Sequence, residues 1–192
     1  MPKIIDHDKK KQEILTIAYE NIQKQGKQGT SVRSIASNAN MTPGQIRYYF
    51  PNQTQLLQEV LNMLSKHIEE QIFSLLSNNA LPIQERIVQS ILLTMPLDEQ
   101  RRADMIVWLA VQESNAQSNE HPMTDDIYRL VAASFEQLDH HNMIKKSIDK
   151  EKAITKLHAL IDGLALHKLY NESLDNKLIE TIIAEEIQFW ME

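Results

Sequence analysis

Apolar residues recur every three or four positions in several segments of this chain, which is the spacing of an amphipathic α-helix. The first such segment covers residues 8–25 and is followed by Gly26, a residue suited to a left-handed helix cap. After a predicted polar loop at 27–30, Ser31 is placed to cap a second short helix. The run Asn38-Ala39-Asn40 then supplies residues that tolerate positive φ, which predicts a sharp turn.

A third and a fourth helix are predicted after this turn. Thr42 is placed as the N-cap of the third helix, and Pro43 fits the first helical position, where its missing N–H does no harm. Pro51 ends this helix, and Asn52 is placed to cap a long fourth helix that continues to about Ser77.

The remainder of the chain repeats the helical spacing. Helices are predicted after Pro82 and Thr124 and over residues 98–114, 149–170 and 175–190, with a loop at 115–123. Glycine and proline are scarce, at 4 and 6 among 192 residues, which leaves few residues for tight hairpin turns. We therefore expect an all-α fold of about nine helices without a sheet, divided into a three-helix domain at residues 1–60 and a larger helical domain at 61–192.

The composition narrows the classes of protein to consider. With 42% hydrophobic residues the chain can bury a core, and the absence of cysteine excludes disulfides, thiol nucleophiles and thiolate metal sites. No apolar run approaches the roughly 18 residues of a membrane span, and the N-terminus lacks the apolar segment of a signal peptide. A cytoplasmic location without membrane contact is expected.

The charge is unevenly distributed. Residues 1–60 hold 8 Lys and Arg against 5 Asp and Glu, a net of +3, whereas residues 61–192 hold 12 against 21, a net of −9. These two values account for the overall charge of −6. The positive part of the chain is therefore the part with the three short helices, and the acidic remainder is read as a solvated helical surface.

The predicted third helix is two-faced. Ile46 and Phe50, four residues apart, are expected to face the core. The opposite side carries polar and aromatic residues, namely Gln45, Arg47, Tyr48 and Tyr49. Three short helices with a tight turn between the second and third are typical of a helix-turn-helix, in which the third helix enters the major groove of DNA.

DNA explains the outward residues chemically. Arg47 and the two tyrosine hydroxyls suit phosphate oxygens, and Gln45 carries the paired donor and acceptor that suit adenine. Thr42 and the N–H groups at the helix start can hold a further phosphate, and Gly44 allows close approach of the backbone. The run Lys9-Lys10-Lys11 either adds sequence-independent attraction or is an ordinary solvated N-terminus.

The first 60 residues resemble the TetR family of bacterial regulators. The resemblance rests on several residues together, which are Ile14, Leu15, Ala18, Gly26, Thr30 to Ala36, Met41 to Ile46, Tyr49, Phe50, Leu56 and Leu57. The C-terminal stretches 95–110 and 161–166 are similar to those of the BetI-type subgroup. The resemblance implies a homodimer that binds a palindromic operator, usually as a repressor, and releases it when a small molecule enters the C-terminal domain.

The resemblance also implies which residues contact DNA. Carried over by position, these are Ser31, Arg33, Thr42, Pro43, Gly44, Gln45, Arg47, Tyr48, Tyr49 and Gln53. Arg47 stands where the family often has tyrosine and preserves a phosphate contact. Gln53 stands where a lysine is usual and removes one ion pair, and Asn40 replaces a common glycine in the turn.

The last two predicted helices carry apolar stripes that either form an intrachain core or pack against a second copy. The resemblance favours a homodimer through these helices as a four-helix bundle, with Gly163 allowing close approach. An effector pocket is expected between the fourth, sixth, seventh and eighth helices, lined by Met63, His67, Trp108, Gln112, Tyr128 and Asp162. Each of these six also has a plain structural interpretation, and Trp108 with an acid would suit a cationic ligand.

Enzymatic activity is not expected. The sequence has no phosphate loop, no HExxH, no dinucleotide-binding fingerprint and no nucleophile elbow. Asp139-His140-His141 suggests a metal site, but neighbours on a helix point apart, so a polar helix end is preferred. We therefore expect a ligand-responsive DNA-binding regulator without metal or cofactor, and the alternative is a helical dimeric interaction protein without DNA binding.

Overall fold

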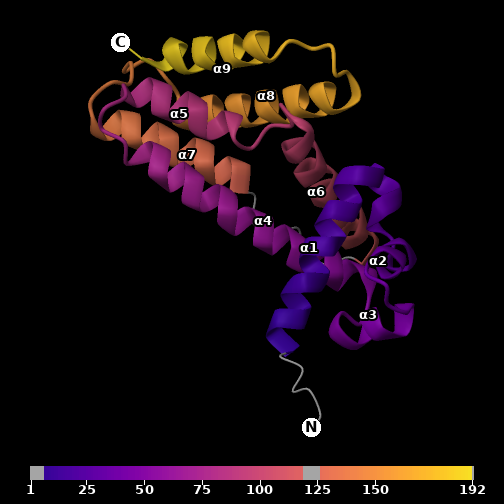
Figure 1. Cartoon of the computed structure of the whole chain (residues 1–192). Coiled ribbons are helices and arrows are strands. Elements are labelled where there is room, and N and C mark those ends of the chain that lie inside the picture. The colour runs from indigo at the N-terminus through magenta and orange to yellow at the C-terminus, as the bar shows by residue number, and fades with distance from the viewer. Residues whose placement is uncertain (1–6, 119–125, 192) are drawn as a thin grey trace. The chain divides into compact units, whose positions relative to one another are not determined.

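The computed structural model describes residues 7–118 and 126–191 and is helical throughout (Figure 1). Within these residues there are nine α-helices and one short 3₁₀-helix, and the sole pairing of extended backbone is an isolated bridge between Ile144 and Met191. The predicted all-α fold of about nine helices is confirmed. In the same part of the chain, no helix combines the length and the apolar character needed to cross a membrane.

The chain divides into two compact units, and two long helices, α4 at Gln53–Leu76 and α6 at Glu99–Ser118, contribute to both. The N-terminal unit comprises Met1–Lys66 and Arg102–Pro122, and the C-terminal unit comprises His67–Arg101 and Met123–Glu192.

The N-terminal unit begins with α1, which spans His7–Gln25. Its predicted apolar face is fully buried and consists of Ile14, Leu15, Ala18 and Ile22. Gly26 has a φ of 57°, as expected of a left-handed cap. The predicted loop after it is wrong in form, because Gly26–Thr30 winds into a 3₁₀-helix, η1.

Three helices follow, α2 at Val32–Asn38, α3 at Pro43–Tyr49 and α4 at Gln53–Leu76 (Figure 1). The predicted cap of α4 is confirmed, because Asn52 Oδ1 accepts a hydrogen bond from the backbone N–H of Gln55 at 2.8 Å. The first turns of α4 bury Leu56, Leu57, Val60, Leu61 and Leu64. This apolar stripe gives the short helices of the unit a surface to pack against.

Helix α6 spans Glu99–Ser118 and completes the N-terminal unit from residue 102 onward. The predicted loop at 115–123 is therefore wrong in its first part, where the helix continues to Ser118, and residues 119–123 lie outside the described residues. Tyr19 of α1 donates a hydrogen bond to Asp104 of α6 at 2.7 Å. Trp108, on the same helix, is half-buried.

The C-terminal unit contains α5 at Ile83–Leu92, α7 at Asp126–His140, α8 at Lys150–Tyr170 and α9 at Asn176–Trp190. Asp149 and Asp175 stand where the last two helices were predicted to begin, and each carboxylate caps its helix by accepting from a backbone N–H of the first turn. The predicted cap Thr124 lies outside the described residues.

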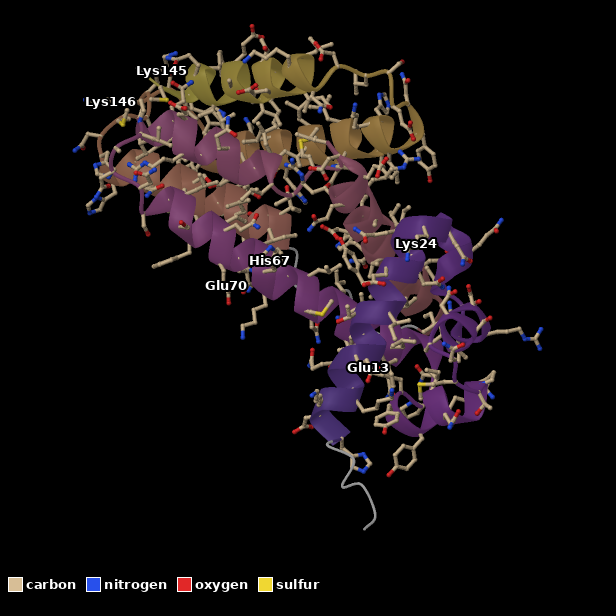
Figure 2. The ribbon with its side chains drawn as sticks, in the orientation of Figure 1. Glu13, Lys24, His67, Glu70, Lys145 and Lys146 are labelled. Carbon is tan, nitrogen blue, oxygen red and sulfur yellow. The ribbon has the colours of Figure 1, made fainter. Side chains whose placement is uncertain are left out.

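Helices α8 and α9 run side by side (Figure 1). One aromatic contact and one backbone hydrogen bond fix the C-terminal end of α9. Trp190 is 1% exposed and packs on Phe135 of α7 with 5.4 Å between ring centroids. The backbone N–H of Lys145, in the segment between α7 and α8, donates to the Trp190 carbonyl at 2.9 Å. Figure 2 shows Lys145 and Lys146 beside this end of α9.

Candidate nucleic-acid interface

The α2–turn–α3 segment is built as its residue types predict. Ser31 caps α2, its hydroxyl accepting from Ser34 N at 3.2 Å, and Val32, Ile35 and Ala36 are buried. In the turn, Asn40 adopts a φ of 51°, and the backbone N–H of Met41 donates to the Ala36 carbonyl at 2.9 Å. The left-handed residue lets the chain reverse within four residues and start α3 at a fixed position.

A capping box fixes the start of α3. Thr42 Oγ1 accepts from Gln45 N at 3.2 Å, and Gln45 Oε1 accepts from Thr42 N at 2.8 Å. Pro43 occupies the first turn, as predicted. The side chain of Gln45 is exposed, and its amide oxygen accepts the capping hydrogen bond, so a contact of this amide with a base would compete with the cap.

The two faces of α3 are separated as the sequence predicts. Ile46 and Phe50 are 0% and 1% exposed, whereas Tyr48 is 71% exposed. Gln45 and Arg47 are also exposed, and Tyr49 is half-buried. The helix therefore presents a polar and aromatic surface that the core does not need.

Other residues predicted to contact DNA lie close to these positions in the sequence. Arg33 on α2 is exposed, Ser31 is half-buried at its cap, and Gln53 is exposed at the first position of α4. Gly44 is exposed, and a Cβ built on it meets only Thr42 Oγ1, at 3.8 Å. The fold of the chain itself thus leaves room for a side chain at Gly44.

The lysine run at the start of α1 is partly engaged within the protein. Lys10 forms an ion pair with Glu13 at 3.0 Å, and Lys11 forms one with Glu59 of α4 at 2.6 Å. The Lys11 ammonium also lies over the Phe50 ring, 5.5 Å from its centroid. Lys11 therefore ties α1 to α4 and to the end of α3.

The rings of His7, Tyr48 and Tyr49 form a cluster between the start of α1 and the end of α3, which was not predicted from the sequence. The His7 ring lies 5.8 Å from the rings of both Tyr48 and Tyr49, and these two tyrosines meet edge-on at 5.1 Å. The signal available in the sequence was the spacing of His7 and Lys11, which places both on one face of α1.

The six predicted effector residues are divided between the two units. Met63, Trp108 and Gln112 belong to the N-terminal unit and are half-buried, whereas His67, Tyr128 and Asp162 belong to the C-terminal unit and are exposed. Figure 2 shows His67 on α4. A ring nitrogen of His67 lies 2.8 Å from the side-chain nitrogen of Gln71.

The structure links two of these residues through His158, which the sequence reasoning missed. The Tyr128 ring meets the His158 ring edge-on at 5.8 Å, and His158 Nε2 lies 3.4 Å from Asp162 Oδ2. The i, i+4 spacing of His158 and Asp162 on α8 was the signal for this pair.

The histidines at the end of α7 correct one argument from the sequence. The rings of His140 and His141 meet edge-on at 5.6 Å, although helical neighbours were expected to point apart, because α7 ends at His140. Among the described residues, no group of three or more His, Cys, Asp or Glu side chains is placed to hold a metal ion.

Two family models match the chain. The model described as bacterial regulatory proteins of the tetR family matches residues 14–60, and the model described as the C-terminal region of BetI-type transcriptional repressors matches residues 83–188. The second match alone covers more than half of the 192 residues.

Similar proteins include curated and structural relatives. The HTH-type transcriptional regulator PksA of Bacillus subtilis is 29% identical over 191 residues, which cover 98% of this chain and 93% of PksA. A transcriptional regulator from Saccharomonospora viridis, solved in complex with choline, superposes with a TM-score of 0.79 at 22% identity, covering 96% of this chain and 99% of that one. NalD, the secondary repressor of a multidrug efflux pump in Pseudomonas aeruginosa, gives 0.64 at 22% identity, covering 97% and 98%. The chain belongs to the TetR family of bacterial transcriptional regulators and carries the BetI-type C-terminal region.

Proposed function

We propose that this transcriptional regulator is a repressor that binds a palindromic operator as a homodimer and releases it when a small molecule binds. The observation that carries this proposal is the division of α3, which buries Ile46 and Phe50 and leaves Gln45, Arg47 and Tyr48 exposed. The exposed arginine and tyrosine side chains beside the capped helix start can donate hydrogen bonds to the phosphate oxygens of DNA.

The proposed DNA-binding domain is residues 1–60, and the proposed contacts are the ten residues already named on α2, α3 and the start of α4. Gly44 supports this assignment, because the chain leaves open space at a position where glycine is not required by its own backbone. A DNA backbone in close approach gives that glycine a purpose.

DNA binding is tested by fluorescence anisotropy with a labelled duplex from the region immediately upstream of the protein's own gene. Arg47→Ala and Tyr48→Ala should weaken binding while leaving the helical circular dichroism unchanged, and Arg47→Ala should reduce the slope of log K against log salt by about 0.9. Arg129→Ala on α7 is the matched control, since Arg129 is exposed in the other unit.

Unchanged affinity in both α3 variants would contradict this mode of DNA binding. Failure of the unaltered protein to bind DNA at low salt would instead support the alternative, a dimeric interaction protein without DNA binding.

We propose that two copies of the chain form the homodimer through their α8 and α9 helices. These helices expose large apolar side chains, which are Leu166, Tyr170, Leu178 and Phe189 at 38, 81, 48 and 59%. A groove on this pair is lined by Lys156, Ala159, Leu160, Ile182, Glu185, Glu186 and Phe189. Apart from its chain neighbours and the backbone of its own helix, no described atom lies within 4 Å of a Cβ built on Gly163, so the space beside this glycine is available to a partner helix.

We infer that the effector is a small cation bound within residues 61–192, and of the six candidates we retain His67, Tyr128 and Asp162, which belong to one compact unit. The linked Tyr128, His158 and Asp162 side chains offer aromatic rings and a carboxylate, which suit an ammonium group. Choline, the ligand of the Saccharomonospora viridis regulator, is such a cation.

Choline titration tests this inference. It should raise the thermal midpoint of the protein and weaken operator binding, and Asp162→Asn should reduce both effects without changing operator affinity in the absence of ligand. Glycine betaine, which adds a carboxylate, serves as the comparison ligand. No response to either compound would remove a small quaternary ammonium from consideration.

A further inference from the structure

The first turn of α1 lies against the C-terminal end of α3. His7 contacts the rings of Tyr48 and Tyr49, each at 5.8 Å between centroids, and Lys11, one turn later, lies over Phe50. Both residues face α3 because positions four apart share one side of a helix. The position of His7 is therefore set by contacts with α3.

His7 differs from Lys11 in its partners. The Lys11 ammonium is paired with the Glu59 carboxylate at 2.6 Å, whereas among the described residues no carboxylate oxygen pairs with a ring nitrogen of His7 within 4.0 Å. The His7 side chain is exposed, and so is Tyr48, its neighbour in the cluster. An imidazole placed in this way keeps its nitrogens available for a partner outside the chain.

The surroundings of His7 favour an anionic partner. On α3, the phenol rings of Tyr48 and Tyr49 contact the His7 ring, and Arg47 precedes Tyr48 in the sequence. On α1 itself the neighbouring charges are Asp8 and the run Lys9-Lys10-Lys11, and α4 contributes Glu59, which Lys11 engages.

We propose that His7 is an additional phosphate-binding residue of the operator interface, held in place by the rings of Tyr48 and Tyr49, and that its protonation strengthens DNA binding. The proposal rests on the proposed function, since it requires α3 to face DNA. The protonated imidazole ring has two N–H donors and a positive charge for a phosphate. DNA affinity should then rise as pH falls from 8 to 6.

The experiment measures affinity by anisotropy at pH 6 and pH 8 with two duplexes, the upstream region of the gene and a random sequence at low salt. A phosphate contact carries no sequence information, so both duplexes should bind more tightly at pH 6. The expected gain is up to about fivefold, the size of one exposed ion pair. His7→Gln should remove this gain while keeping a side chain that donates and accepts.

Two further variants separate charge from ring packing. His7→Lys should bind at both pH values as tightly as the unaltered protein binds at pH 6, and its salt slope at pH 8 should rise by about 0.9. His7→Phe preserves the ring contacts and should bind with the pH-independent affinity of His7→Gln. His141→Gln, at an exposed histidine of the C-terminal unit, is the matched control and should titrate like the unaltered protein.

The outcomes are distinguishable. If both duplexes bind and His7→Gln keeps the full pH dependence, the His7 inference is wrong while the proposed function stands. If neither duplex binds at low salt at either pH, the proposed function fails, and this inference fails with it.

Discussion

The side-chain amide of Asn21 donates to the carbonyl oxygen of Gly29 at 2.8 Å and to Ser34 Oγ at 3.0 Å, which ties α1 to η1 and α2 at one buried point. Asn21 is 1% exposed, and a Cβ on Gly29 would lie only 2.4 Å from the Asn21 backbone oxygen. The two backbones approach so closely that only glycine fits, and the position of the helix-turn-helix on α1 depends on this contact.

Replacing Gly29 should therefore destabilise the N-terminal unit. Gly29→Ala forces the Asn21 backbone to move, and we expect the free energy of unfolding to fall by about 1–3 kcal/mol, as for other overpacked sites. Chemical denaturation followed by circular dichroism measures the change. Gly44→Ala is the matched control, because its Cβ makes only an ordinary contact with Thr42 Oγ1 and alanine favours the helix. Equal stability of the two variants would contradict this account.

The same control variant separates folding from DNA binding. Gly44→Ala should leave the free energy of unfolding within about 1 kcal/mol of the unaltered protein or raise it. Its operator affinity should fall, because the new methyl group keeps the DNA backbone from close approach. Anisotropy with the upstream duplex measures the loss, and full affinity in Gly44→Ala would show that no backbone approaches this glycine.

The capping box of α3 should contribute measurably to stability. Thr42→Ala removes the acceptor for Gln45 N, and we expect the free energy of unfolding to fall by about 1 kcal/mol. Thr42→Ser keeps the hydroxyl and should restore most of the loss. If serine and alanine behave alike in urea denaturation, the hydroxyl does not act as a cap.

Local signals predicted the N-terminal unit well because its geometry is determined by residues close in sequence. The caps Ser31, Thr42 and Asn52, the positive φ of Asn40 and the buried pair on α3 each follow from a short pattern. The ring cluster around His7 was missed because it joins α1 to α3, about forty positions later in the sequence. Helix periodicity gives the face of a residue but not the element it meets.

Dimerisation through α8 and α9 should be sensitive to Gly163. Gly163→Glu places a charge in the space proposed for the partner helix, and the dimer should dissociate at concentrations where the unaltered protein remains paired. Sedimentation velocity measures the shift. Ala133→Glu, at an exposed position of α7, is the control for the added charge. A dimeric Gly163→Glu variant would place the interface elsewhere.

Stability in acid should depend on Asp98 at the start of α6. Burial alone raises the pKa of Asp98, but the Arg101 side-chain and backbone hydrogen bonds and the Arg101 charge together hold this pKa below its usual range. The ionised form therefore stabilises the fold above the unfolded-state pKa near 4, and this contribution is lost as pH falls through the lower folded-state pKa.

Urea denaturation over a pH series tests this assignment. Asp98→Asn should lower the urea midpoint of unfolding near pH 7. The difference in midpoint between this variant and the unaltered protein should become smaller as the solution becomes acidic. A constant difference at all pH values would show that the charge of Asp98 is not responsible.

The effector site was the part least accessible to sequence reasoning. A pocket is assembled from several elements, and periodicity does not give the placement of one helix against another. The six candidates accordingly divide between the two compact units, and the residue that joins Tyr128 to Asp162, His158, was not among them. The four-residue spacing of His158 and Asp162 can be seen in the sequence, but the contact of Tyr128 from α7 with His158 cannot.

The two tryptophans of the chain are distributed one to each unit. Trp190 is enclosed against Phe135 in the C-terminal unit, and Trp108 is half-buried on the part of α6 that belongs to the N-terminal unit. The unlabelled protein thus carries its own pair of optical reporters. Replacing either indole with phenylalanine leaves emission from a single unit, so that melting of one half ahead of the other can be followed by fluorescence alone.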